Sequence, residues 1–185
     1  MKNTVIRYGL ISGALMSAMM ALTISLFHDQ IGFDTGGLVV GYTTMVLAFL
    51  LIYFGVRSYR DTVGGGTIGF GRALAVGALI AALASACYVA TWEVMYFKFM
   101  PDFMDKYSAH QMEKERASGA SDAQIASKKA EWDRFAEMYK NPLYNVAMTF
   151  MEPLPVGLII ALISAGVLSR RRKDVVGSHV PVTST

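Results

Sequence analysis

The chain has 185 residues, a length that fits a single domain, but its composition excludes an ordinary soluble one. Hydrophobic residues make up 54% of the sequence, charged residues only 17%, and the net charge is +3. A soluble helical protein needs helices with one apolar stripe, whereas the long uncharged windows of this sequence are apolar on all sides. Windows of this kind are typical of an integral membrane protein.

Four windows are long enough to cross a bilayer, which takes about 20 apolar residues. Three of them carry no charge and the fourth carries only Glu152; they cover residues 8–27, 36–56, 73–92 and 143–169. The first follows a basic flank but is about twice as long as the apolar run of a signal peptide, so we expect a retained helix. The sequence therefore predicts an all-α integral membrane protein with four transmembrane helices.

Basic residues gather on one side of these four helices. The helix ends and short linkers of that side carry nine basic and two acidic residues, whereas the long segment on the other side carries eight of each. Because positive charge collects on the cytoplasmic side of membrane proteins, both termini are predicted to be cytoplasmic. Anionic lipid headgroups already account for these arginines, so no nucleic-acid partner is expected.

A glycine-rich loop is predicted on the cytoplasmic side, over residues 57–72. It holds five glycines between positions 64 and 71, and glycine permits tight turns. We favour a tight turn at the level of the lipid headgroups over a phosphate-binding loop, because no strand is expected before it and no Gly-Lys-Ser/Thr sequence is present. The residues assigned to this turn and to headgroup contact are Arg57, Arg60, Gly65, Gly66 and Arg72.

Residues 98–141 are predicted to form a helical hairpin outside the membrane, between the third and fourth transmembrane helices. Ser121 followed by Gln124 is a capping box that opens its second arm. Asn141 is expected to cap the next helix, which Pro142 begins. Aromatic residues at helical spacing predict that Trp132, Phe135 and Tyr139 are partly buried against Phe103 and Tyr107.

The predicted organisation has four parts. Residues 1–97 hold the first three transmembrane helices and the loop, 98–141 the extracytoplasmic hairpin, 142–172 the fourth helix and 173–185 a disordered cytoplasmic tail. Small residues recur at every fourth position in the first, third and fourth helices. This pattern predicts a closely packed four-helix bundle, and an interface in a homo-oligomer remains an alternative.

Glu93 and Glu152 are the candidate functional residues. They lie 21 residues from Arg72 and 18 residues from Arg170. At about 1.5 Å per residue, both are near the outer boundary of a core about 30 Å thick. Ionisable residues at membrane depth are often functional, so we interpret the pair as a candidate proton or cation site, shared if the two face each other. Alternatively, each is an interfacial residue that reaches water or pairs with a base such as Lys98.

Pro153 and Pro155 follow Glu152 directly. A proline inside a helix removes a backbone hydrogen bond, so the two predict a helix bend beside the carboxylate. The freed carbonyl groups then need partners inside the protein or in a cavity.

No cofactor, metal or catalytic residue is predicted. The sequence has three histidines and one cysteine, Cys87, and lacks zinc-type and serine-triad motifs. A metal site made of His28, Glu93 and Glu152 is conceivable, but these residues have no diagnostic spacing. Asp29 and Asp34 would lie at the same level as His28.

The run Tyr59-Arg60-Asp61, together with Gly65 through Ala73, resembles the central motif of a bacterial membrane-protein family, domain of unknown function 4199. The layout of helices over residues 5–172 is similar as well. The resemblance implies this topology and a bacterial inner-membrane location, and it implies no activity. The sequence Glu152-Pro153-Leu154-Pro155 departs from a more generic last helix, which puts a family-wide role for Glu152 in doubt.

Two functions remain open from the sequence. The first is a non-enzymatic membrane protein, either a small transport or permeation component or a partner in a membrane complex. Its partners would be membrane lipids and a second copy or another membrane protein. The alternative is an intramembrane lipid-modifying enzyme with Glu93 or Glu152 as general acid or base.

Overall fold

A computed structural model of the chain describes residues 1–26 and 35–169. This part of the chain contains no strand. It forms seven α-helices and one π-helical turn: α1 (Lys2–Leu26), α2 (Thr35–Thr62), α3 (Phe70–Val94), η1 (Met95–Phe99), α4 (Phe103–Ala117), α5 (Asp122–Tyr139), α6 (Pro142–Phe150) and α7 (Pro153–Leu168).

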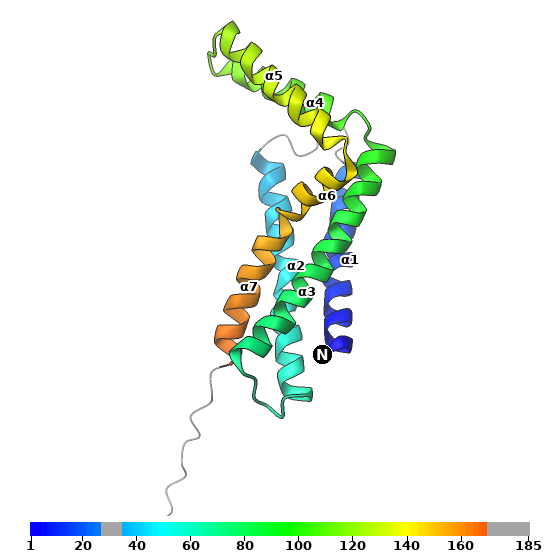
Figure 1. The fold of residues 1–185 in the computed structure, drawn as a ribbon, viewed down its shortest axis with the longest axis vertical. Coiled ribbons are helices and arrows are strands. Elements are labelled where there is room, and N and C mark those ends of the chain that lie inside the picture. The colour runs from blue at the N-terminus through cyan, green and yellow to red at the C-terminus, as the bar shows by residue number, and fades with distance from the viewer. Residues whose placement is uncertain (27–34, 170–185) are drawn as a thin grey trace, which may run out of the picture.

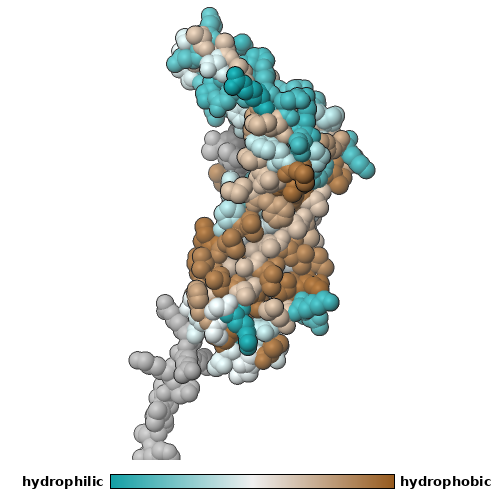
Figure 2. Space-filling model, viewed as in Figure 1, coloured by the Kyte–Doolittle hydropathy of each residue, from teal (hydrophilic) through white to brown (hydrophobic). Residues whose placement is uncertain are grey.

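Four helical segments are long and apolar enough to cross a membrane: residues 2–25, 39–62, 70–99 and 142–168. The predicted all-α class and the four candidate spans are thereby confirmed. In Figure 1 the spans lie alongside one another, with the N-terminus, the loop after α2 and the end of α7 at one end and α4 and α5 at the other. Figure 2 shows a largely hydrophobic surface on the bundle and a hydrophilic one on α4 and α5.

The predicted loop over residues 57–72 is shorter in the structure. Helix α2 continues to Thr62 and α3 begins at Phe70, so only residues 63–69 are non-helical. Residues 56–63 contain no glycine or proline that would end the helix, and an ion pair of 3.7 Å joins Arg57 to Asp61 one turn later. The chain then reverses at Gly65 and Gly66, whose φ angles of 60° and 87° lie in the left-handed region that favours glycine.

The fourth predicted helix, residues 142–172, is two helices over its described part. Helix α6 ends at Phe150, and a turn at Met151 and Glu152 leads into α7. In this turn the amides of Met151 and Glu152 bond carbonyls three residues back, those of Met148 and Thr149. Pro153 has no N–H with which to continue the α-helical pattern. Residues 170–172 and the predicted tail, 173–185, lie outside the described residues.

Helices α4 and α5 pack against each other through aromatic rings, as predicted. Ser121 and Gln124 form the capping box at the start of α5, and the Asn141 side chain caps α6. The rings of Tyr107 and Trp132 lie 5.1 Å apart between centroids. Phe103, Tyr107, Trp132, Phe135 and Tyr139 are all partly buried.

Small residues bring α3 close to its neighbours. A Cβ added at Gly157 of α7 would lie 2.8 Å from the Cβ of Ala81, and one added at Gly13 of α1 would lie 2.6 Å from the Cβ of Cys87. Both distances are too short for real side chains. The stripes of small residues therefore serve the packing of this bundle, and α3 stands at its centre, in contact with α1, α2 and α7.

Candidate functional site

Glu152 lies in the break between α6 and α7, where it faces α3. The hydroxyl of Tyr88, on α3, donates a hydrogen bond of 3.1 Å to Oε2 of Glu152. Both side chains are partly buried. No lysine, arginine or histidine of the described residues forms an ion pair with this carboxylate.

A cluster of four hydrogen-bonded side chains lies beside this pair, and we call it the polar cluster: Trp92, Tyr139, Asn145 and Thr149. The indole Nε1 of Trp92 donates to the Tyr139 hydroxyl and to Oδ1 of Asn145, each at 3.1 Å. The hydroxyls of Tyr139 and Thr149 are 3.2 Å apart, and Thr149 donates to Oδ1 of Asn145 at 3.1 Å. Donors and acceptors are thus matched among α3, α5 and α6.

Tyr139 connects the cluster electrostatically to both candidate carboxylates. Burial raises the pKa of its phenol, the hydrogen bonds with Thr149 and Trp92 oppose that rise, and the charges of Glu152 and Glu93 add to it. Tyr139 therefore lies within electrostatic reach of the two acidic residues, which come from different helices.

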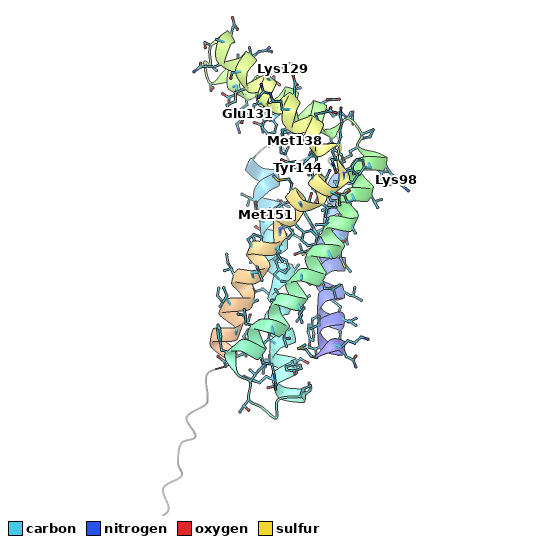
Figure 3. The ribbon with its side chains drawn as sticks, in the orientation of Figure 1. Lys98, Lys129, Glu131, Met138, Tyr144 and Met151 are labelled. Atoms are coloured by element: carbon cyan, nitrogen blue, oxygen red, sulfur yellow. The ribbon has the colours of Figure 1, made fainter. Side chains whose placement is uncertain are left out.

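Glu93 has surroundings different from those of Glu152. Glu93 is the residue after Trp92, so its side chain points about 100° further around the helix than the Trp92 side chain, which belongs to the polar cluster. Its Oε1 is buried and accepts no hydrogen bond from any described residue. No hydrogen bond or ion pair joins Glu93 to Glu152 or to Lys98 among the described residues, and Lys98 is exposed on η1 (Figure 3).

Tyr88 also borders a cavity that is lined by α1, α2 and α3. The cavity has a volume of about 140 Å³ and lies between α1 and α2. Tyr88 and Trp92 form its α3 wall, and four methionines contribute to the rest: Met16, Met19, Met20 and Met45. Tyr88 thus contacts both a cavity of the bundle and the carboxylate of Glu152.

Reasoning from the sequence missed Tyr88, Asn145 and Thr149 as parts of this site. Two signals were available. Asn145 is an amide within an apolar window, where an unsatisfied polar group is costly, and Thr149 follows it by one helical turn. Tyr88 and Trp92 are likewise four residues apart and so share one face of α3.

At the opposite end of the bundle, the residues predicted for the turn do lie together. Arg57, Arg60, Gly65, Gly66 and Arg72 line an open cavity of about 1410 Å³, which we call the arginine basin. His28, Asp29 and Asp34 lie outside the described residues. Within residues 1–26 and 35–169, no three His, Cys, Asp or Glu side chains gather as metal ligands would.

The sequence matches one family model, "Protein of unknown function (DUF4199)", over residues 7–170. No curated protein matches the chain. No solved structure matches it either.

Proposed function

We propose a function for this chain, which belongs to the DUF4199 family of proteins of unknown function, from the geometry of the site around Glu152. The chain is a non-enzymatic protein of the bacterial inner membrane. It acts as a small transport or permeation component, or as a partner in a membrane complex, and Glu152 is its proton-sensitive or cation-sensitive group. Glu93 is the second carboxylate of the proposed site.

One observation carries this proposal: the carboxylate of Glu152 stands at a helix break with a tyrosine as its hydrogen-bond partner, and no basic residue within 1–26 and 35–169 forms an ion pair with it. A charged carboxylate inside a protein is costly unless a cation balances it. A proton or a small cation supplies that balance. Discontinuous membrane helices are a recurrent setting for ion and proton sites in transporters.

The break also supplies a way for the bound proton or cation to change the structure. Pro155 has no N–H for the carbonyl of Met151, so the turn between α6 and α7 lacks a helical hydrogen bond. A change in the charge of Glu152 alters its bond with Tyr88, which is the side-chain hydrogen bond from α3 to this turn.

Infrared difference spectra of the reconstituted full-length protein test whether Glu152 binds a proton. Between acidic and alkaline buffer, we expect the band of a protonated carboxyl group to disappear. Glu152→Gln removes that band and keeps the size of the side chain. Glu131→Gln is the control, because Glu131 is 71% exposed on α5. Equal spectra for Glu152→Gln and the wild type contradict a proton site at Glu152.

A cation is tested separately with sodium and potassium ions alone. Trp92 belongs to the polar cluster, so its fluorescence, isolated by Trp132→Phe, reports on this region. A salt-dependent change that is lost in Glu152→Gln supports a cation site. Adding Glu93→Gln decides whether the two carboxylates share it: a shared site predicts non-additive effects and separate sites predict additive ones.

The proposed topology places both termini in the cytoplasm and the α4–α5 pair outside it. A reporter that is active only outside the cytoplasm is fused within the full chain at Ser118 or after Lys173. We expect activity at Ser118 and none after Lys173, since the basic residues gather at the other end of the bundle. Activity after Lys173 overturns the orientation.

The alternative function, an intramembrane lipid-modifying enzyme, is favoured by one observation: the buried Oε1 of Glu93 accepts no hydrogen bond from the described residues. Such an oxygen is available to a reacting group. Mass spectrometry of phospholipids in vesicles that contain the protein tests this function. New lipid species with the wild type, absent with Glu93→Gln, favour the enzyme over the non-enzymatic protein.

A further inference from the structure

The arginine basin is lined by the loop between α2 and α3 and by the end of α7, and Figure 1 shows these segments at the end of the bundle opposite α6. Helix α2 contributes Arg57 and Arg60, and α3 contributes Arg72 from its first turn. Ser169 and Leu168, at the end of α7, form another wall. Three separate segments therefore present basic or polar groups to one cavity.

The charges of the basin do not cancel. Asp61 is the acidic residue of its lining; Arg60 bonds it at 2.7 Å, and Arg57 approaches it at 3.7 Å. Arg72 is exposed and forms no ion pair with any described residue. The three arginines and Asp61 give a net charge of +2 at a level where four membrane-spanning helices begin or end.

The backbone at the entrance to α3 adds further donors. The N-cap residue, Gly69, provides no side-chain cap, so the first amides of this 25-residue helix are unsatisfied by a side chain there. Residues 64–69 also match the spacing G-x-G-x-x-G, although a helix precedes them instead of a strand. Amides at the start of a helix favour anions, as arginine side chains do.

Apolar side chains border the same cavity. Val63 lines it with a side chain that is 59% exposed, and the largely buried Tyr59, Ile68 and Leu168 line it as well. A free inorganic anion gains nothing from contact with apolar side chains, whereas an amphiphile with a phosphate group can bury its apolar part against them. The combination of arginines and apolar wall at the end of a membrane span therefore favours a lipid.

We propose that the arginine basin binds the phosphate group of an anionic phospholipid, with Arg57, Arg60 and Arg72 around the phosphate and the apolar lining residues, chiefly Val63, against the glycerol end. Inorganic phosphate shares the anionic chemistry and lacks the apolar part. The site depends on the folded loop and on nothing in the site around Glu152.

Native mass spectrometry of the full-length protein in detergent tests this proposal. The protein is titrated with phosphatidylglycerol, with phosphatidylcholine of the same acyl chains, and with inorganic phosphate alone. We expect phosphatidylglycerol to bind at least tenfold more tightly than the other two, and Arg72→Gln to weaken it about tenfold, as the loss of one charge-assisted bond implies. The control is Arg7→Gln, which removes an exposed arginine of α1 outside the basin and leaves binding unchanged.

Three outcomes overturn the proposal. Equal binding of the two phospholipids shows that the anionic headgroup is not recognised. Equal binding of inorganic phosphate and phosphatidylglycerol shows a site for free phosphate. Unchanged phosphatidylglycerol binding in both Arg72→Gln and Arg57→Gln, each with the helical circular-dichroism spectrum of the wild type, shows that the lipid binds elsewhere.

Discussion

The two halves of α3 are held in different ways. Toward the loop end, α3 meets α7 through small residues, with Gly77 against Ala161 and Ala81 against Gly157. Toward the other end, Tyr88 and Trp92 donate hydrogen bonds to Glu152, Tyr139 and Asn145. Where α3 meets α5, α6 and α7, it thus uses close packing in one half and directional bonds in the other, while its close packing against α1 continues as far as Cys87.

The difference shows how each half gains specificity in a membrane. Apolar side chains have as much to gain from lipid as from each other, so helices associate through close packing and hydrogen bonds. Close packing tolerates no added atoms, whereas a hydrogen-bonded cluster tolerates shape changes and is sensitive to the loss of a polar atom. An added side chain should therefore destabilise the closely packed half most, and the loss of a polar atom should destabilise the hydrogen-bonded half most.

The largest effect is expected from an added side chain in the packed half. Gly157→Leu places a Cβ 2.8 Å from Ala81 and 3.1 Å from the ring of Phe49. We expect it to lower stability by about 3 kcal/mol, because overfilled contacts must separate. Thermal unfolding in detergent, followed by circular dichroism, measures this. Gly166→Leu on the same helix, with open space around its Cβ, should cost nothing; equal losses would contradict the packing argument.

Loss of a polar group in the other half should have the next largest effect. Asn145 is fully buried, accepts from Trp92 and Thr149 and donates to the backbone of Tyr139. Asn145→Leu removes one hydrogen-bond partner from each of these groups and leaves Trp92 and Thr149 only the Tyr139 hydroxyl. We expect a loss of about 1–2 kcal/mol in the same unfolding measurement. Met148→Leu, exposed on the same helix, is the control. A stabilised Asn145→Leu would show that the cluster adds nothing to the bundle.

A double-mutant cycle sharpens the comparison further. Trp92→Phe removes the indole donor, and its coupling with Asn145→Leu should be about 0.6 kcal/mol, a typical value for a hydrogen bond between membrane helices. Its coupling with Gly77→Ala should be near zero, since 15 residues of helix, about 22 Å, separate the two positions. Equal couplings would mean that the two halves are not independent.

The smallest effect concerns pH. Burial raises the pKa of the Tyr139 phenol, so the folded state favours the protonated form. Its contribution to stability is therefore complete below the unfolded pKa of about 10 and is lost as pH rises through the higher folded value. We expect Tyr139→Phe to cost about 0.6 kcal/mol at neutral pH and less in alkaline buffer. Tyr144 lies outside the cluster, so the stability difference between Tyr144→Phe and the wild type should not shrink in alkaline buffer.

Several features of the fold could be predicted because they depend on local chemistry. The capping box at Ser121 requires only residues three positions apart. The small-residue stripes of α1, α3 and α7 were visible for the same reason. The end of α2 was missed by six residues, because charged side chains end a hydrophobic window without ending a helix.

The site around Glu152 was predictable only in part. A lone carboxylate before two prolines in an apolar window drew attention to Glu152, Pro153 and Pro155. Its partner, Tyr88, is 64 residues away in the chain, and no spacing rule links such residues. Glu93 and Glu152 were paired from their estimated depth, which says nothing about the side of the helix on which each lies.

The sequence by itself determined the class of protein, the four candidate spans and the family, since hydrophobicity over about 20 residues is a local property. Only the tertiary structure decided that Tyr88 faces Glu152, that Trp92 enters a cluster with Tyr139, Asn145 and Thr149, and that three arginines line one basin. Those arrangements depend on the rotation of each helix about its axis. That rotation follows from where neighbouring backbones can approach most closely, as at Gly13 and Gly157, and it is therefore a property of the packed bundle.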